Sequence, residues 1–227
     1  MSDKPVRNTP DYDFDIITLL KEGFTRIEGV KGLFFSAFAV YVVIAMILQT
    51  VLAVFFPLQT ASGEENLLNQ QIVTILSYPV LMPILAGIIM LAIQYTRGEK
   101  LEIKSIFTYY SMTWTLALAA LLVYLLTLLG IVFFVLPGIY LSVAYLFTLP
   151  LIADKHMPVW DAMELSRKTV TRHWFKVFGL VLILGMLLFG GILTLGIGLI
   201  WAVPVLFVTL YGLLYTAIFD EETSFNQ

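Results

Sequence analysis

The chain has 227 residues, of which 59% are hydrophobic and only 13% are charged, and its mean hydropathy is +0.91. About a quarter of a soluble domain is charged, so this chain has too few charges to cover a water-soluble globule. The lack of cysteine excludes disulfides and thiolate chemistry, and a net charge of −3 gives no argument for nucleic-acid binding. The composition therefore indicates an integral membrane protein.

Four long stretches of the chain contain no Asp, Glu, Lys or Arg: 32–63, 66–96, 105–153 and 177–219. A membrane helix needs about 20 apolar residues, so these stretches hold one, one, two and two spans. We predict an all-α integral membrane protein with six transmembrane helices as three hairpins, each preceded by a cytoplasmic amphipathic interfacial segment. The predicted spans lie near 32–56, 72–95, 113–135, 138–153, 177–196 and 200–219. They form one membrane domain, 32–219, between a cytoplasmic N-terminal segment with an amphipathic helix, 1–31, and an acidic cytoplasmic tail, 220–227.

All thirteen Lys and Arg residues lie on one side of this predicted topology. They occur in the N-terminal segment, between spans two and three, and between spans four and five, whereas the other connections contain none. Because Lys and Arg in short loops favour the cytoplasmic side, both termini are predicted to be cytoplasmic.

The segment 158–176 has the clearest amphipathic spacing among those that precede the hairpins. Its apolar residues recur on one helical face, and Lys168, Arg172 and Lys176 form a basic ridge on the other. Such a helix is expected to lie in the headgroup plane of the membrane. The candidate lipid-headgroup contacts are Trp160, Arg167, Lys168, Arg172, Trp174 and Lys176. Ordinary anchoring without a specific ligand is the alternative interpretation.

Two other segments repeat this pattern more weakly. Asp13 or Asp15 is expected to cap a helix within 13–31, and the segment 101–112 would form the third copy. The apolar faces are Ile17, Leu20, Phe24 and Ile27 in the first segment, and Ile103, Phe107 and Tyr110 in the second. Together the three segments would surround the cytoplasmic face.

Each returning span is predicted to begin with a proline, and its first cytoplasmic charge follows 16–18 residues later. The prolines are Pro79, Pro137 and Pro204, and the charges are Arg97, Asp154 and Asp220. Proline suits a first helical turn, whereas Pro83 and Pro150 lie further inside and are expected to kink or end their helices. The pattern fits a threefold duplication, and it also fits any three helical hairpins.

No charged residue lies inside the predicted spans, which weighs against a proton-coupled transporter. His156 and His173 have no carboxylate at ligand spacing, so no metal, other cofactor or catalytic residue is predicted. Asp154 is expected to pair with Arg167 or Arg172, or to contact a lipid headgroup.

Uncharged polar residues do occur within the spans, where they commonly make interhelical hydrogen bonds. Four tyrosines on the two later returning helices are candidates for lining a shared cavity that takes an amphiphile. They are Tyr140, Tyr145, Tyr211 and Tyr215. Simple packing at helix interfaces is the alternative.

Residues 136–179 contain a Pro-Gly-Ile turn, a span that ends in Pro-Leu-Ile-x-Asp, and an Ala-x-x-x-Ser helix that leads into the next span. Ala162, Ser166 and Trp174 occupy the positions expected for this pattern, and 83–107 fits an earlier part of it. The chain resembles the YciC-like family of uncharacterised bacterial six-helix inner-membrane proteins, to which membrane domains of some glycerophosphodiester phosphodiesterases look related. The resemblance implies a bacterial cytoplasmic (inner) membrane and six helices, and it implies no activity.

The leading hypothesis is a non-enzymatic protein that binds or organises lipid or assists envelope maintenance. Its expected partners are membrane lipids with anionic headgroups on the cytoplasmic side, and no nucleic acid. Alternatives are a passive transporter or channel for a lipidic or small neutral solute, and an accessory subunit of a membrane complex. A second copy of the chain is a further partner left open.

Overall fold

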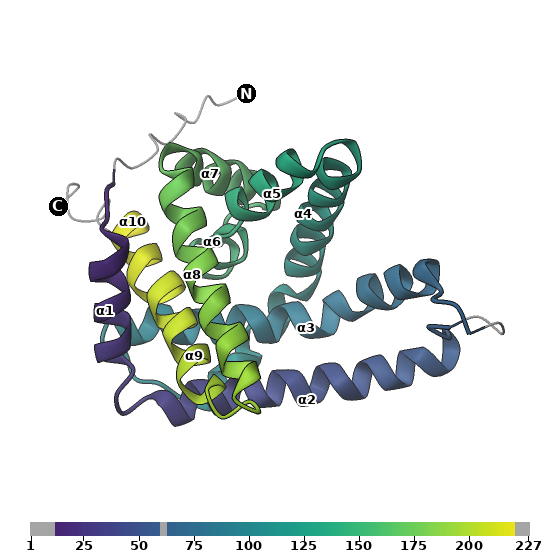
Figure 1. Ribbon diagram of the computed structural model, residues 1–227, viewed down its shortest axis with the longest axis horizontal. Coiled ribbons are helices and arrows are strands. Elements are labelled where there is room, and N and C mark those ends of the chain that lie inside the picture. The colour runs from purple at the N-terminus through teal and green to yellow at the C-terminus, as the bar shows by residue number, and fades with distance from the viewer. Residues whose placement is uncertain (1–11, 60–62, 221–227) are drawn as a thin grey trace.

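The structure is a computed structural model that describes residues 12–59 and 63–220, so only Asp220 of the predicted acidic tail lies within it. The described residues form helices and no β-strand, which confirms the all-α prediction (Figure 1). In chain order the elements are α1 (Ile16–Arg26), α2 (Lys31–Phe55), α3 (Leu67–Thr96), the 3₁₀ helix η1 (Ile103–Met112), α4 (Thr113–Phe133), α5 (Val135–Ala144), α6 (Thr148–Lys155), α7 (Val159–Arg172), α8 (Trp174–Leu193), α9 (Leu199–Leu206), the π-helix η2 (Phe207–Leu214) and α10 (Tyr215–Phe219).

Six of the described helical stretches are long and apolar enough to cross a membrane. They are Lys31–Phe55, Leu67–Thr96, Ile103–Phe133, Val135–Lys155, Trp174–Leu193 and Leu199–Phe219. All six coincide with predicted spans to within a few residues, except that the second and third begin earlier. The chain is therefore a multi-pass membrane protein, and we refer to these stretches as spans one to six.

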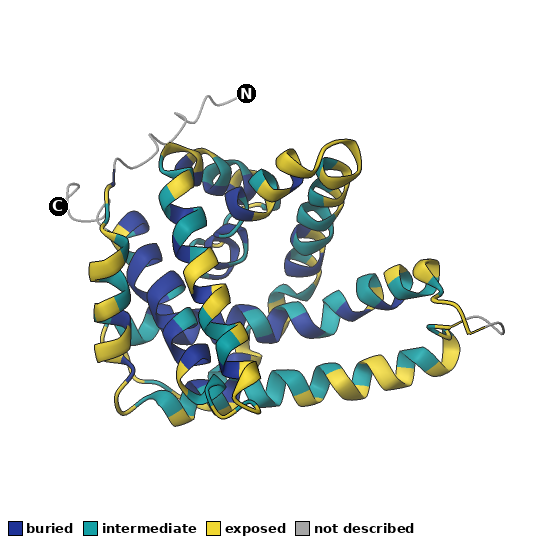
Figure 2. Ribbon diagram, in the orientation of Figure 1, coloured by how far each residue is buried: buried dark blue, intermediate teal, exposed yellow. Residues whose placement is uncertain are grey.

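Span six lies at the centre of the molecule and span one at its edge. Most of span six is buried, as is the second half of α3, whereas the most apolar part of span one has no buried residue. Figure 2 shows this difference as dark blue around α9 and α10 against teal and yellow along α2. Most exposed side chains of α2 are large and apolar, which suits a surface that faces lipid rather than water.

Consecutive spans pack against each other as three hairpins, α2 with α3, α4 with α5, and α8 with α9. In Figure 1 the α2–α3 hairpin extends away from α4 and from the α8–α9 pair. The expectation that each returning span begins with proline is wrong for two of the three hairpins. Pro137 is in the first turn of α5, but Pro79 lies inside α3 and Pro204 in the middle of α9.

Span four is broken into α5 and α6, which are separated by the turn 145–147. Pro150 explains the break, because its ring would clash with the carbonyl four residues earlier in a continuous helix. The buried hydroxyl of Ser166, from α7, bridges the broken backbone. Its Oγ accepts a hydrogen bond from the Phe147 N–H at 3.1 Å and donates one to the Ala144 carbonyl at 2.8 Å.

The three predicted interfacial segments all fold, but with other boundaries. Of the segment 101–112, residues 103–112 form η1, which runs directly into α4. The α1 helix is capped by Asp15, which accepts a hydrogen bond from the Thr18 N–H at 2.8 Å. Its Ile17 and Phe24, predicted for an apolar face, are exposed, because the helix turns Gly23 toward Thr209 of η2.

The segment 158–176 is not one helix. The α7 helix ends at Arg172, and the backbone leaves the helical region at His173, so that Trp174 and Lys176 belong to the first turn of α8. The buried face of α7 includes Ser166 and Thr169, because it packs against span four rather than lying free on a membrane surface.

Gly87 allows α3 and η1 to make close contact, and its replacement by alanine tests this packing. A Cβ at Gly87 would lie 2.5 Å from the Ile106 Cα and 2.7 Å from its carbonyl carbon. We expect Gly87→Ala to lower the free energy of unfolding by about 1–3 kcal/mol, as overpacking does. Thermal unfolding in mild detergent measures the effect. Gly185→Ala in α8 is the matched control, since a Cβ there meets no atom within 4 Å in the described structure. Equal melting temperatures for the two variants would contradict the predicted clash.

Candidate functional site

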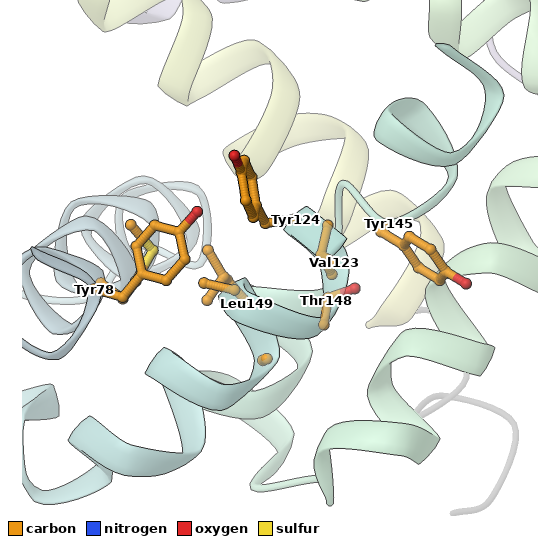
Figure 3. A pocket seen from close by; sticks show the side chains of 9 residues that line it. Tyr78, Val123, Tyr124, Tyr145, Thr148 and Leu149 are labelled. Carbon is orange, nitrogen blue, oxygen red and sulfur yellow. The ribbon is translucent and has the colours of Figure 1, made fainter. Parts of the chain in front are cut away.

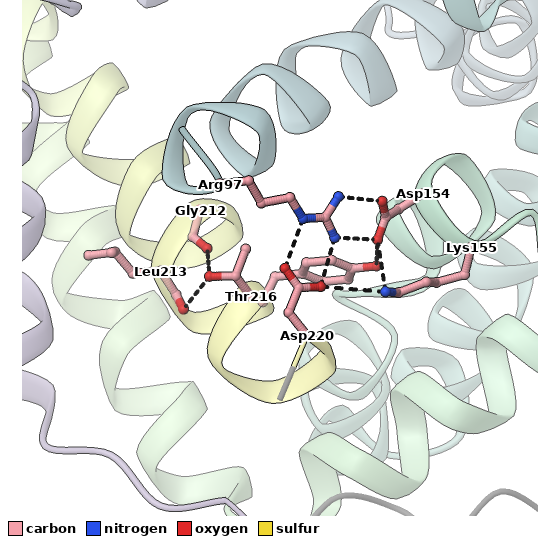
Figure 4. A network of polar contacts seen from close by, with 8 residues as sticks. Arg97, Asp154, Lys155, Gly212, Leu213, Thr216 and Asp220 are labelled. Carbon is pink, nitrogen blue, oxygen red and sulfur yellow. Dashed lines mark hydrogen bonds and ion pairs between the residues drawn. The ribbon is translucent and has the colours of Figure 1, made fainter. Parts of the chain in front are cut away.

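The charged residues that end the three returning spans meet in one polar cluster (Figure 4). Arg97 follows α3, Asp154 lies in the last turn of α6, and Asp220 follows α10. The Arg97 guanidinium donates to both Asp154 oxygens at 2.7 and 2.8 Å, and to both Asp220 oxygens at 2.8 and 2.7 Å. One arginine therefore makes a two-pronged contact with each of two carboxylates and joins the ends of spans two, four and six.

Lys155 and Tyr215 complete this group, which we call the Arg97 cluster. Lys155 Nζ lies 3.4 Å from an Asp220 oxygen and 3.5 Å from an Asp154 oxygen, and the Tyr215 hydroxyl donates to Asp154 at 2.9 Å. Its two cations balance its two carboxylates. Hydrogen bonds to Asp154 and Asp220 raise the pKa of Arg97 above its usual value, so its charge is held at any pH the protein meets.

The prediction that Asp154 pairs with Arg167 or Arg172 is wrong, because the main partner of Asp154 is Arg97. Arg167 instead donates to Glu164, three residues earlier on α7, at 2.8 and 2.9 Å. This hydrogen bonding lowers the pKa of Glu164 and raises that of Arg167. In the sequence, the signal for the cluster is the similar position of the three span-ending charges, 16–18 residues after a proline, although this spacing does not identify which charges pair.

The candidate headgroup contacts lie along α7 and at its junction with α8, and some have partners within the protein. Lys168 lies 3.2 Å from Glu164, and Lys176 forms an ion pair with Asp13. This pairing lowers the pKa of Asp13. The basic ridge is therefore partly neutralised within the protein.

Aromatic side chains at the same junction and at the start of α7 differ in exposure. Trp174 stacks on Phe178 with ring centres 4.9 Å apart, and its indole N–H donates to the Tyr140 carbonyl at 3.3 Å. Trp160 is 66% exposed and Phe175 is 84% exposed. Such large apolar surfaces favour the boundary between lipid headgroups and chains over water.

The four candidate tyrosines do not share one cavity. Tyr140 shares a 2.7 Å hydrogen bond with Thr171, whereas Tyr211 and Tyr215 pack against the Phe147 ring at centre distances of 6.5 and 6.0 Å. Only Tyr145 lines the pocket described next. The alternative, packing at helix interfaces, describes Tyr211 and Tyr215 better.

A pocket of about 250 Å³ lies between α3, α4 and the break in span four. Figure 3 shows Tyr78 on one side and Tyr145 on the other, with Leu149 and Thr148 between them. Its lining is uncharged and consists of Tyr78, Met82, Ala119, Ala120, Val123, Tyr124, Tyr145, Thr148 and Leu149. Tyr78 carried no signal in the sequence, because a tyrosine in a span is as typical of simple packing as of a pocket.

No protein-family model, curated protein or solved structure matches this chain. The similarity to YciC-like proteins therefore stays a prediction from the residues of 83–107 and 136–179. The function has to be argued from the α7–α8 junction, the Arg97 cluster and the pocket.

Removal of Arg97 tests whether the Arg97 cluster holds the three spans together. Arg97→Gln leaves Asp154, whose side chain is only 9% exposed, close to Asp220 without the guanidinium between them. We expect the free energy of unfolding to fall by about 2–4 kcal/mol, somewhat less than for a fully buried pair. Denaturation in mild detergent measures the loss.

Arg167→Gln is the control for this substitution, because its pair with Glu164 is more exposed and should be worth less than about 1 kcal/mol. If both variants lose the same stability, the Arg97 cluster is an ordinary surface ion pair.

Proposed function

We propose that this protein binds or organises lipid in a bacterial cytoplasmic membrane and thereby contributes to envelope maintenance, without catalysing a reaction. In this proposal both termini lie on the cytoplasmic side, as the distribution of Lys and Arg favours. The α7–α8 junction is then at the cytoplasmic boundary of the membrane, where it meets lipid headgroups.

The exposed aromatic and basic side chains of the α7–α8 junction carry the proposal. Phe175 offers apolar surface at the junction, and Lys168 and Arg172 are exposed cations in the last two turns of α7. Trp160 adds exposed apolar surface in the first turn of α7. Cations near an anionic leaflet contribute about 1 kcal/mol each, and aromatic rings prefer the same depth. This combination suits an anionic phospholipid that lies against the junction.

The ion pairs within the junction are compatible with such binding. Arg167 and Lys168 pair with Glu164, the three side chains being 33–43% exposed, and pairs this exposed are worth only about 0–1 kcal/mol. Exchange of Glu164 for a lipid phosphate therefore costs little. The Arg97 cluster is less suited to the same role, since its own carboxylates already occupy its cations.

Passage of a lipidic or small neutral solute is a second candidate function, favoured by the break in span four. Transporters commonly bind substrates where a membrane helix is interrupted, and the pocket lies at such an interruption. Solute flux into proteoliposomes tests this candidate, and the absence of flux over a panel of neutral solutes counts against it.

Neutralisation of the junction tests the lipid proposal. We expect the triple variant Lys168→Gln, Arg172→Gln, Lys176→Gln to lose most of the phosphatidylglycerol that the wild type retains, because the phosphate loses its counter-charges. Native mass spectrometry of protein from nanodiscs with phosphatidylglycerol and phosphatidylcholine measures the retained lipid.

The matched control is Lys21→Gln, Lys100→Gln, Lys104→Gln, which removes the same charge from other exposed lysines of the predicted cytoplasmic face. Melting temperatures establish that each variant is folded. Equal phosphatidylglycerol retention in both triple variants would show that only the overall charge matters, and the junction would not be a lipid site.

A further inference from the structure

The break in span four leaves one buried hydroxyl without a partner. In a continuous helix, Thr148 Oγ would donate to the carbonyl of Ala144, four residues earlier. Here that carbonyl accepts the Ser166 hydroxyl, and the Tyr145 carbonyl accepts the Thr148 N–H. Thr148 is only 1% exposed, and its Oγ has no hydrogen-bond partner among the described residues.

Thr148 also lines the pocket, where it lies between Tyr78 and Tyr145 (Figure 3). Tyr124 donates its hydroxyl to Gln71, and its ring meets Tyr78 edge to face with centres 6.2 Å apart. One wall of the pocket is therefore aromatic, and a second includes Thr148, whose buried hydroxyl is unused. Apart from Tyr145, the rest of the lining is aliphatic or methionine.

The pocket opens toward the outer surface of the spans. Tyr78, Val123, Tyr124, Tyr145 and Leu149 are each only partly buried. Because these residues lie in the middle parts of spans two, three and four, the surface around them is in contact with lipid chains. A ligand can then enter sideways from the membrane with its chain left in the lipid.

We propose that this pocket binds the uncharged, carbonyl-bearing part of a membrane lipid, with the carbonyl oxygen accepting a hydrogen bond from Thr148. An ionic group is disfavoured, because no lining residue described here carries a charge to pair with it. The volume equals that of roughly eight water molecules, which suits one ring or one ester group rather than a whole phospholipid.

Two sources supply this chemistry, the ring of a quinone and the ester of a diacylglycerol. The site lies within the spans and differs from the α7–α8 junction. The proposal for this pocket depends on the proposed lipid function only in assuming that the ligand is a lipid. Either site can therefore be disproved while the other remains valid.

The test is equilibrium binding of two probes, decylubiquinone and dioctanoylglycerol, to the purified protein in mild detergent, measured by native mass spectrometry. Thr148→Val removes the hydroxyl and keeps the shape. We expect it to weaken probe binding about two- to tenfold, the usual range for one hydrogen bond. Its melting temperature should not fall, since that hydroxyl has no protein partner to lose.

Thr127→Val is the matched control, because the Thr127 hydroxyl is also buried without a partner among the described residues but does not line the pocket. It should leave binding unchanged. Ala120→Phe places a ring in the pocket and should abolish binding of either probe.

Binding of decylubiquinone alone identifies a quinone ring as the ligand, and binding of dioctanoylglycerol alone identifies an ester. The proposal is overturned if neither probe binds the wild type, or if Ala120→Phe does not reduce binding. It is also overturned if Thr148→Val and Thr127→Val have equal effects. These variants keep every cation of the α7–α8 junction, so their outcome is independent of phosphatidylglycerol retention there.

Discussion

The guanidinium of Arg97 contacts two carboxylates from distant parts of the sequence, and the ends of spans two, four and six depend on it. Arginine suits this position because its planar group offers donors along two edges at once, which a lysine cannot do. Asp154 takes one edge and Asp220 the other, each at 2.7–2.8 Å. Without the arginine, Lys155 would be the one cation of the cluster left beside two carboxylates at the end of the buried span six, where repulsion and desolvation both oppose folding.

The six spans could be predicted from the sequence because they depend on length and hydropathy alone. The charges that end the returning spans could also be located, since they interrupt apolar runs at nearly equal spacing. Their partners could not be identified, because a pairing over 57 or 123 residues depends on how the hairpins pack. The local sequence suggested Arg167 as a partner for Asp154, but Arg167 pairs with Glu164, which lies three residues before it on the same helix.

The break in span four also has one cause in the local sequence and another in the packing of distant helices. Pro150 predicts an interruption from the chemistry of a single residue. The hydroxyl of Ser166 that bridges the interruption comes from α7, and most of the pocket wall comes from α3 and α4. Sequence spacing grouped four tyrosines by helix, whereas the fold combines one of them with Tyr78 and Tyr124 from two other spans. A cavity belongs to the packing of several helices, so the pattern of one helix does not predict it.

The Arg97 cluster, the α7–α8 junction and the pocket differ in charge, and each therefore suits a different kind of ligand or none. The Arg97 cluster is balanced within itself and joins spans. The α7–α8 junction lies where α7 meets the start of span five and carries exposed cations, which suits an anionic headgroup. The pocket has hydroxyls and rings but no charge, which suits an uncharged group. Ser166 connects the last two, because it extends from α7 to the backbone break that leaves Thr148 unpaired.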